Sequence, residues 1–167
     1  MGLFAFIKSA GEKLFHHGEA QAATVAVQAD PSPANLEALS AAAGTAVVDY
    51  VHKMGLDANM LSVNFDAGKG EVTVNGVASS QHDMEKIVLC CGNVAGVESV
   101  VNNMTVDEPA DEAQFYTVVA GDTLSKISKE FYDTPNKYQA IFEANTPMLS
   151  HPDKIYPGQM LRIPAEA

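Results

Sequence analysis

The sequence of 167 residues has little cysteine, few basic residues and no long apolar run, and each shortage excludes a class of protein. Its two cysteines, Cys90 and Cys91, are adjacent, so a disulfide between them would need a strained vicinal ring. Neither they nor the His16-His17 pair have further ligands at the spacing of a zinc site. We therefore expect two buried free thiols and two exposed histidines, with redox chemistry of the thiols as the alternative.

Basic side chains are scarce, because 10 lysines and arginines stand against 21 acidic residues and leave a formal net charge of −11. An acidic surface repels phosphate backbones and raises the local concentration of cations. The sequence also lacks the basic stripe that nucleic-acid binding requires. DNA and RNA are therefore not expected as partners.

The sequence has no uninterrupted apolar run of about 20 residues, the length that a membrane-spanning helix needs. The first residues have no basic segment before the apolar ones and no small-residue cleavage site in context, so a signal peptide is not expected. Phe6 stands where a myristoylation signal needs serine or threonine. The expectation is a soluble, monomeric, cytoplasmic protein, and its hydrophobic content of 47% suits two small globular domains.

Helical periodicity marks two segments in the first third of the chain. Apolar residues from Leu3 to Phe15 recur at helical spacing and predict an amphipathic helix that docks on the following domain, with a membrane surface as the alternative. An Ala-rich connector completes residues 1–31. Ser32 as N-cap and Pro33 at the first helical position then predict a helix that stops at Gly55 and that Gly44 could divide.

Alternating apolar residues indicate strands after this helix. Residues 61–77 alternate around the turn formers at 67–70, which predicts a hairpin. Ser79 or Ser80 then caps a second helix, and residues 97–106 supply a third strand. The order αββαβ over residues 32–106 predicts an α+β domain with two helices on one face of a three-stranded sheet.

The second half of the chain has its own pattern. Residues 107–114 are acidic and carry a proline, which is typical of an exposed linker. Residues 115–167 begin with an alternating strand, continue with a helix capped by Asp122 and a second helix that runs to Asn145, and end with a strand at 161–164. The predicted order of this domain is βααβ.

Both halves resemble known domain families. The stretches VTVNGV at 72–77 and GNVAGVESVVN at 92–102 resemble the BON domain, over residues 45–106. YTV at 116–118, GDTL at 121–124, IFEAN at 141–145 and IYPGQ at 155–159 resemble the LysM domain. The LysM resemblance implies binding of N-acetylglucosamine-containing glycans in a groove between two loops, formed by Gly121, Asp122, Thr123, Leu124, Ile155, Tyr156, Pro157, Gly158 and Gln159.

The end of the second helix poses a separate question, because IVLCCGNVAGV at 87–97 has no side chain that can satisfy the last helical carbonyls. These carbonyls form the negative pole of the helix dipole. Solvation at an ordinary glycine stop and the binding of a cation both remain open.

The order of BON followed by LysM, with the N-terminal MGLFAFIKSAGEKLF, resembles the small cytoplasmic bacterial potassium-binding proteins along nearly the whole chain. This resemblance implies a K⁺ sensor or buffer without catalysis. It also implies that the ion is held by the main-chain carbonyls of Ile7, Ala10, Glu12, Gly92, Val94 and Val97. Neutral carbonyl dipoles suit K⁺, whereas a Ca²⁺ loop needs alternating acidic residues, and neither segment has them.

The resemblance leaves several points open. Glycines at 11, 92 and 96 are expected to let the backbone turn its carbonyls inward. Binding of K⁺ would fasten the N-terminal helix and could reorient LysM, while Rb⁺, Cs⁺ and NH₄⁺ and an unidentified protein partner stay open. A cell-envelope module that binds peptidoglycan glycan is the alternative function. An enzyme is not expected, because Asp, His and Ser occupy capping and surface positions.

Overall fold

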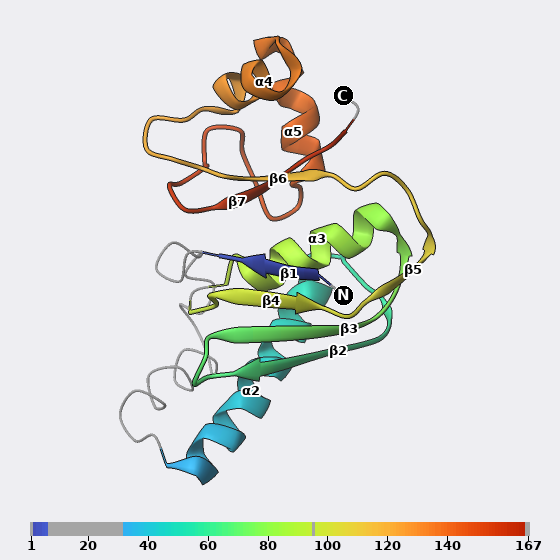
Figure 1. Ribbon diagram of the computed structural model, residues 1–167, viewed down its shortest axis with the longest axis vertical. Helices are drawn as coiled ribbons and strands as arrows, with labels where there is room; N and C mark the ends of the chain where they lie inside the picture. Colours follow the sequence, from blue (N-terminus) through green and yellow to red (C-terminus); the bar gives the residue numbers. More distant parts are fainter. Residues whose placement is uncertain (1, 7–31, 95, 166–167) are drawn as a thin grey trace.

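The computed structural model describes residues 2–6, 32–94 and 96–165, and it consists of two layered units stacked along the long axis (Figure 1). The α+β class is confirmed. The larger unit contains β1 (Gly2–Ala5), α2 (Pro33–Lys53), β2 (Asn59–Asp66), β3 (Glu71–Ser80), α3 (Gln81–Gly92), β4 (Ser99–Asn102) and β5 (Thr105–Glu108). The smaller unit contains β6 (Gln114–Thr117), α4 (Leu124–Tyr132), the 3₁₀ helix η1 (Pro135–Lys137), α5 (Tyr138–Ala144) and β7 (Met160–Ile163).

The larger sheet has five strands, whereas three were predicted. Its order is β1-β4-β3-β2, and β5 continues beside β3 beyond the end of β4. The β2–β3 hairpin turns at residues 67–70 as predicted, and β3 runs parallel to both β4 and β5. The single strand expected over 97–106 is two short strands, which pair with β3 in the same parallel register on either side of residues 103 and 104. In this gap the Met104 N–H donates to Asn102 Oδ1 at 3.0 Å.

Side chains on one face of this sheet form the larger core. Val72, Val74 and Ala78 alternate along β3 and are fully buried, as the period of two requires. Helices α2 and α3 cover this face through Val47, Val51, Ile87 and other residues of one continuous cluster. The predicted arrangement of two helices on one sheet face is therefore confirmed.

Helix α2 runs unbroken through Gly44, so the prediction that this glycine could divide the helix is wrong. An added Cβ at Gly44 would lie only 2.5 Å from the main-chain oxygen of Val63. The glycine therefore allows α2 to approach β2 closely.

The prediction of an N-terminal helix from Leu3 is wrong for its first residues, because Gly2–Ala5 form the edge strand β1. This strand pairs antiparallel with β4, with Leu3 opposite Val101. Phe4 and Phe6, two residues apart, pack against the core, whereas Leu3 is 70% exposed, so burial alternates as in a strand. The open edge of β4 supplies the hydrogen bonds that favour the strand over a helix. The remainder of the predicted helix lies outside the described residues.

The smaller unit has the predicted βααβ order, with β6 and β7 paired antiparallel. Its first helix is capped by Thr123, whose hydroxyl accepts from the Lys126 N–H at 3.2 Å, and the prediction of Asp122 as the cap is wrong. The Asp122 carboxylate instead accepts from the Tyr116 hydroxyl and from the Val119 N–H, both at 2.9 Å. It therefore stabilises the loop before the helix.

Substitution of Gly44 by alanine should destabilise the protein by about 1–3 kcal/mol, because the new methyl group forces α2 away from β2. Urea unfolding followed by circular dichroism measures this change. Helix propensity alone predicts a gain of about 1 kcal/mol for this substitution. The reverse change at an exposed position of the same helix, Ala42→Gly, should show only the propensity loss of about 1 kcal/mol. A stabilised Gly44→Ala variant would contradict the close approach.

Candidate functional site

The turn that follows α3 is held by a main-chain hydrogen bond and by buried side chains. Helix α3 ends at Gly92, and the N–H of its C-cap Asn93 donates to the Leu89 carbonyl at 2.9 Å. The side chains of Val94 and Val97 are only 3% and 2% exposed, so they anchor the turn in the core. Three of the main-chain carbonyls expected from the sequence to hold K⁺, those of residues 92, 94 and 97, therefore lie in or next to one turn that is anchored in the core.

The N-terminal strand ends against this turn. The Phe6 N–H donates to the Glu98 carbonyl at 2.7 Å, and the Phe6 ring packs on the core. An added Cβ at Gly92 would overlap the Phe6 ring. Residues 92–97 are thereby brought beside the start of the FIKSAGE segment, whereas Ile7, Ala10 and Glu12 themselves lie outside the described residues.

Gly92 consequently has a different role from the predicted one. It is the last helical residue of α3 and is not among the glycines with positive φ, so it does not turn the backbone. Its missing side chain makes room for an aromatic ring. Gly96, with φ of +95°, does adopt a conformation that favours glycine.

Side chains offer no obvious metal site near the turn. Within the described ranges, no group of three or more His, Cys, Asp and Glu side chains could hold a metal ion. Cys90 and Cys91 are buried and form no disulfide, as predicted, and burial raises the pKa of Cys91 to about 12. Burial therefore disfavours the thiolate form of Cys91. Main-chain oxygens are the donors that the turn can present.

A buried ion pair joins α3 to the smaller unit. Glu85 is 2% exposed and Arg162, on β7, is 9% exposed. The Arg162 Nε donates to one Glu85 oxygen at 2.5 Å, while the other oxygen accepts from the Ala113 N–H at 3.0 Å and from Gln81 Nε2 at 2.9 Å. Burial, together with the nearby Arg162 guanidinium, lowers the pKa of Lys86. The sequence did not predict that these side chains meet between the two units.

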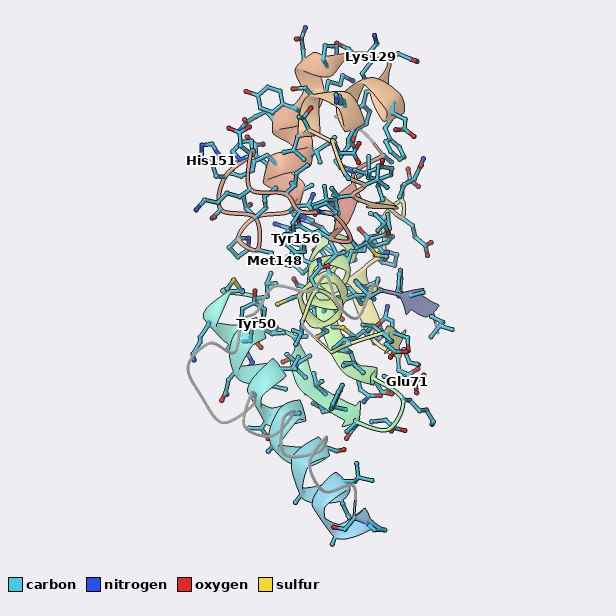
Figure 2. The ribbon with its side chains drawn as sticks, turned by 90° about the vertical axis from the view of Figure 1, so that its left-hand side faces the viewer. Tyr50, Glu71, Lys129, Met148, His151 and Tyr156 are labelled. Carbon is cyan, nitrogen blue, oxygen red and sulfur yellow. The ribbon has the colours of Figure 1, made fainter. Side chains whose placement is uncertain are left out.

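The turn itself also contacts the smaller unit. The Asn93 carboxamide donates to the Met160 carbonyl at 2.9 Å and accepts from the Met160 N–H at 3.1 Å. Phe4 and Phe115 meet edge to face with ring centroids 5.1 Å apart. Met148 packs on the core of the larger unit, and Figure 2 shows it on the side of the smaller unit that faces α2. The two units therefore share one continuous interface.

The predicted glycan-binding loops lie in the smaller unit. Thr123 and Leu124 line a pocket of about 440 Å³, whose remaining walls come from Ser125, Tyr138, His151, Pro152 and Asp153. The residues at 155–159 do not line this pocket. Val118 holds that second loop instead, because its N–H donates to Gln159 O at 2.8 Å and its carbonyl accepts from the Gly158 N–H at 2.7 Å. The pocket thus contains part of the first predicted loop and none of the second.

Sequence reasoning missed Phe6, Glu85, Asn93 and Arg162 as residues that connect the turn to its surroundings. A glutamate within the apolar stretch of α3 is the one signal that could have drawn attention to Glu85, because a buried acid needs a partner. Nothing local in the sequence distinguishes Asn93 from any other asparagine that follows a helix.

Comparison with known proteins agrees with both domain resemblances. The BON domain model matches residues 38–108, and the LysM domain model matches residues 116–164. The potassium binding protein Kbp of Escherichia coli is 44% identical over 99% of this chain and 100% of its own length. An uncharacterized protein of Deinococcus radiodurans is 34% identical over 56% of this chain and 40% of its own length. In the described part of the chain, no helix is long and apolar enough to span a membrane.

Substitution of Gly92 by alanine should expel the Phe6 ring and release β1, because the new methyl group would occupy the position of the ring. We expect destabilisation of about 1–3 kcal/mol and loss of hydrogen-exchange protection at the Phe6 amide. Phe6→Leu should cost less in the Gly92→Ala background than in the wild type. A double-mutant cycle measures this coupling, and additive effects would disprove the contact.

Substitution of Glu85 by glutamine should cost about 3–5 kcal/mol of unfolding free energy, because it leaves the Arg162 guanidinium buried without a counter-charge. Denaturant unfolding measures this loss. The exposed pair of Lys69 with Asp66, 3.1 Å apart, provides the matched control. Lys69→Met should leave the unfolding midpoint unchanged. Equal effects of the two substitutions would show that the buried pair does not hold the interface.

Proposed function

The chain belongs to the family of the potassium binding protein Kbp, and on this premise we propose that it binds K⁺ without catalysing a reaction. The BON and LysM domains occur in the order that the resemblance requires. A cytoplasmic location is part of the proposal, and two buried cysteines without a disulfide are compatible with a reducing compartment.

In the proposed site, the main-chain carbonyls of Ile7, Ala10, Glu12, Gly92, Val94 and Val97 coordinate the ion. The single observation that supports this set is the contact of Phe6 with the turn. Its N–H bonds to the Glu98 carbonyl at 2.7 Å, and its ring packs where a Gly92 side chain would be. The residue that follows Phe6 is the first proposed ligand, so the two ligand segments begin from a shared contact.

The chemistry of the turn suits a large monovalent cation. The last carbonyls of α3 form the negative pole of the helix dipole, and neutral carbonyl dipoles can replace the weakly held water shell of K⁺. A net charge of −11 attracts any cation, so selectivity must come from the number and geometry of the carbonyls. Rb⁺, Cs⁺ and NH₄⁺ are the competitors against which selectivity is to be measured.

A sensor role follows if the ion favours one arrangement of the chain. Bound K⁺ would join the N-terminal segment to the turn, and the turn already contacts LysM through Asn93 and Met160. A ligand shifts such an equilibrium only by its difference in affinity between the two arrangements. The N-terminal segment docks in this proposal through β1 and Phe6, in place of the amphipathic helix expected from the sequence.

Glycan binding by the LysM domain is the second candidate function. The observation in its favour is the pocket of about 440 Å³, in which Tyr138 offers an apolar ring face beside the polar Thr123 and His151. Titration with chitin oligomers in the presence and absence of K⁺ tests this function. Binding that is independent of K⁺ would support a separate glycan module.

The thermal unfolding midpoint should rise in KCl but not in NaCl or choline chloride at equal ionic strength, because a ligand of the folded state stabilises it. At 100 times the dissociation constant the gain is about 2.7 kcal/mol, or on the order of 5–10 °C for a chain of this size. Circular dichroism measures the midpoint. Gly92→Ala should lose the K⁺-specific rise. Identical midpoints of the wild type in all three salts would overturn the proposed function.

A further inference from the structure

Strand β7 pairs with β6 along one edge. Two asparagine side chains form hydrogen bonds with the main-chain groups on its other edge. Asn145, at the end of α5, donates to the Arg162 carbonyl and accepts from the Arg162 N–H, both at 2.8 Å. Asn93 makes the same pair of bonds to Met160, two residues earlier on the strand. Each carboxamide thus supplies the donor and acceptor that a neighbouring strand residue would supply.

The two asparagines differ in where they come from. Asn145 belongs to LysM and is 2% exposed, so its bonds are part of that domain's own core. Asn93 comes from the BON turn, between the proposed ligands Gly92 and Val94. Its main-chain N–H is fixed to the Leu89 carbonyl, while its side chain is fixed to β7. A displacement of the Asn93 Cα would therefore strain the bonds of its carboxamide to LysM.

We propose that Asn93 is the positioning residue that couples the ion-binding turn to the LysM domain. The inference rests on the proposed K⁺ site and assigns its coupling to one side chain. The ion pair of Glu85 with Arg162 starts two turns earlier in α3, so it holds LysM in place whatever the turn does. The Asn93 bonds, in contrast, come from within the turn itself, between two of the proposed ligands.

Coupling of this kind is reciprocal. If the Asn93 bonds hold the turn in the ion-binding conformation, their loss must weaken K⁺ binding, and bound K⁺ must strengthen the contact with LysM. Asn93→Ala is expected to weaken K⁺ affinity about tenfold. It should also abolish any K⁺-dependent change in the arrangement of the two domains, while Glu85 and Arg162 keep the domains together.

Isothermal titration with KCl in choline chloride buffer of constant ionic strength measures affinity, and small-angle scattering with and without K⁺ measures the domain arrangement. Asn103→Ala is the matched control. It removes a carboxamide on the open sheet face whose bond to Asn75 is 3.4 Å long, and it should bind K⁺ as the wild type does. Wild-type affinity in Asn93→Ala together with an unaltered scattering response would overturn the inference.

A second variant separates coupling from loss of packing. Asn93→Leu keeps a side chain of similar size beside β7, but it can neither donate to the Met160 carbonyl nor accept from the Met160 N–H. It should therefore weaken K⁺ binding as much as Asn93→Ala does. Wild-type affinity in Asn93→Leu would contradict the role of the two bonds.

Failure of the inference and failure of the proposed function give different results. If wild type shows no heat of K⁺ binding and no K⁺-specific rise in midpoint, the site itself is wrong and the inference falls with it. If wild type binds K⁺ and both Asn93 variants bind it equally well, the site stands and Asn93 is only an interface contact.

Discussion

A carboxylate withdrawn from water must be given hydrogen-bond donors, and Glu85 obtains its donors from both halves of the chain. Gln81 comes from its own helix, Ala113 from the connection between the domains, and Arg162 from the last strand. Loss of any one donor would leave a buried charge partly unsatisfied, at a cost of several kcal/mol. This requirement ties the connection between the domains and strand β7 to α3, so one acid on α3 links three parts of the chain.

Helix α3 consequently belongs to two interfaces at once. Ile87, Val88 and Cys91 pack in the core of the sheet, while Glu85 and the C-cap Asn93 reach the smaller unit. A helix enclosed in this way has little freedom to shift, and its last turn inherits that rigidity. Carbonyl groups that are to replace the water around an ion benefit from such a preorganised frame, because their orientation then costs little on binding.

Local patterns predicted much of the fold, because hairpins, helix caps and alternating strands are determined by neighbouring residues. The turn at 67–70 and the cap at Ser80 are examples. The edge strand β1 could not be predicted in this way, since it depends on hydrogen bonds to the distant strand β4. The candidate site was also predicted only in part. The family resemblance indicated Gly92. The reason for a glycine there is the Phe6 ring packed against it, and this contact exists only in the folded chain.

The pairing of β1 with β4 has a consequence for biosynthesis. Strand β1 pairs with a strand that is made only after both helices of the larger unit. Until β4 is in place, Phe4 has no strand edge to join. Strand β1 must therefore wait for its partner while the rest of the domain is synthesised. It is then among the last strands of this domain to reach its native position.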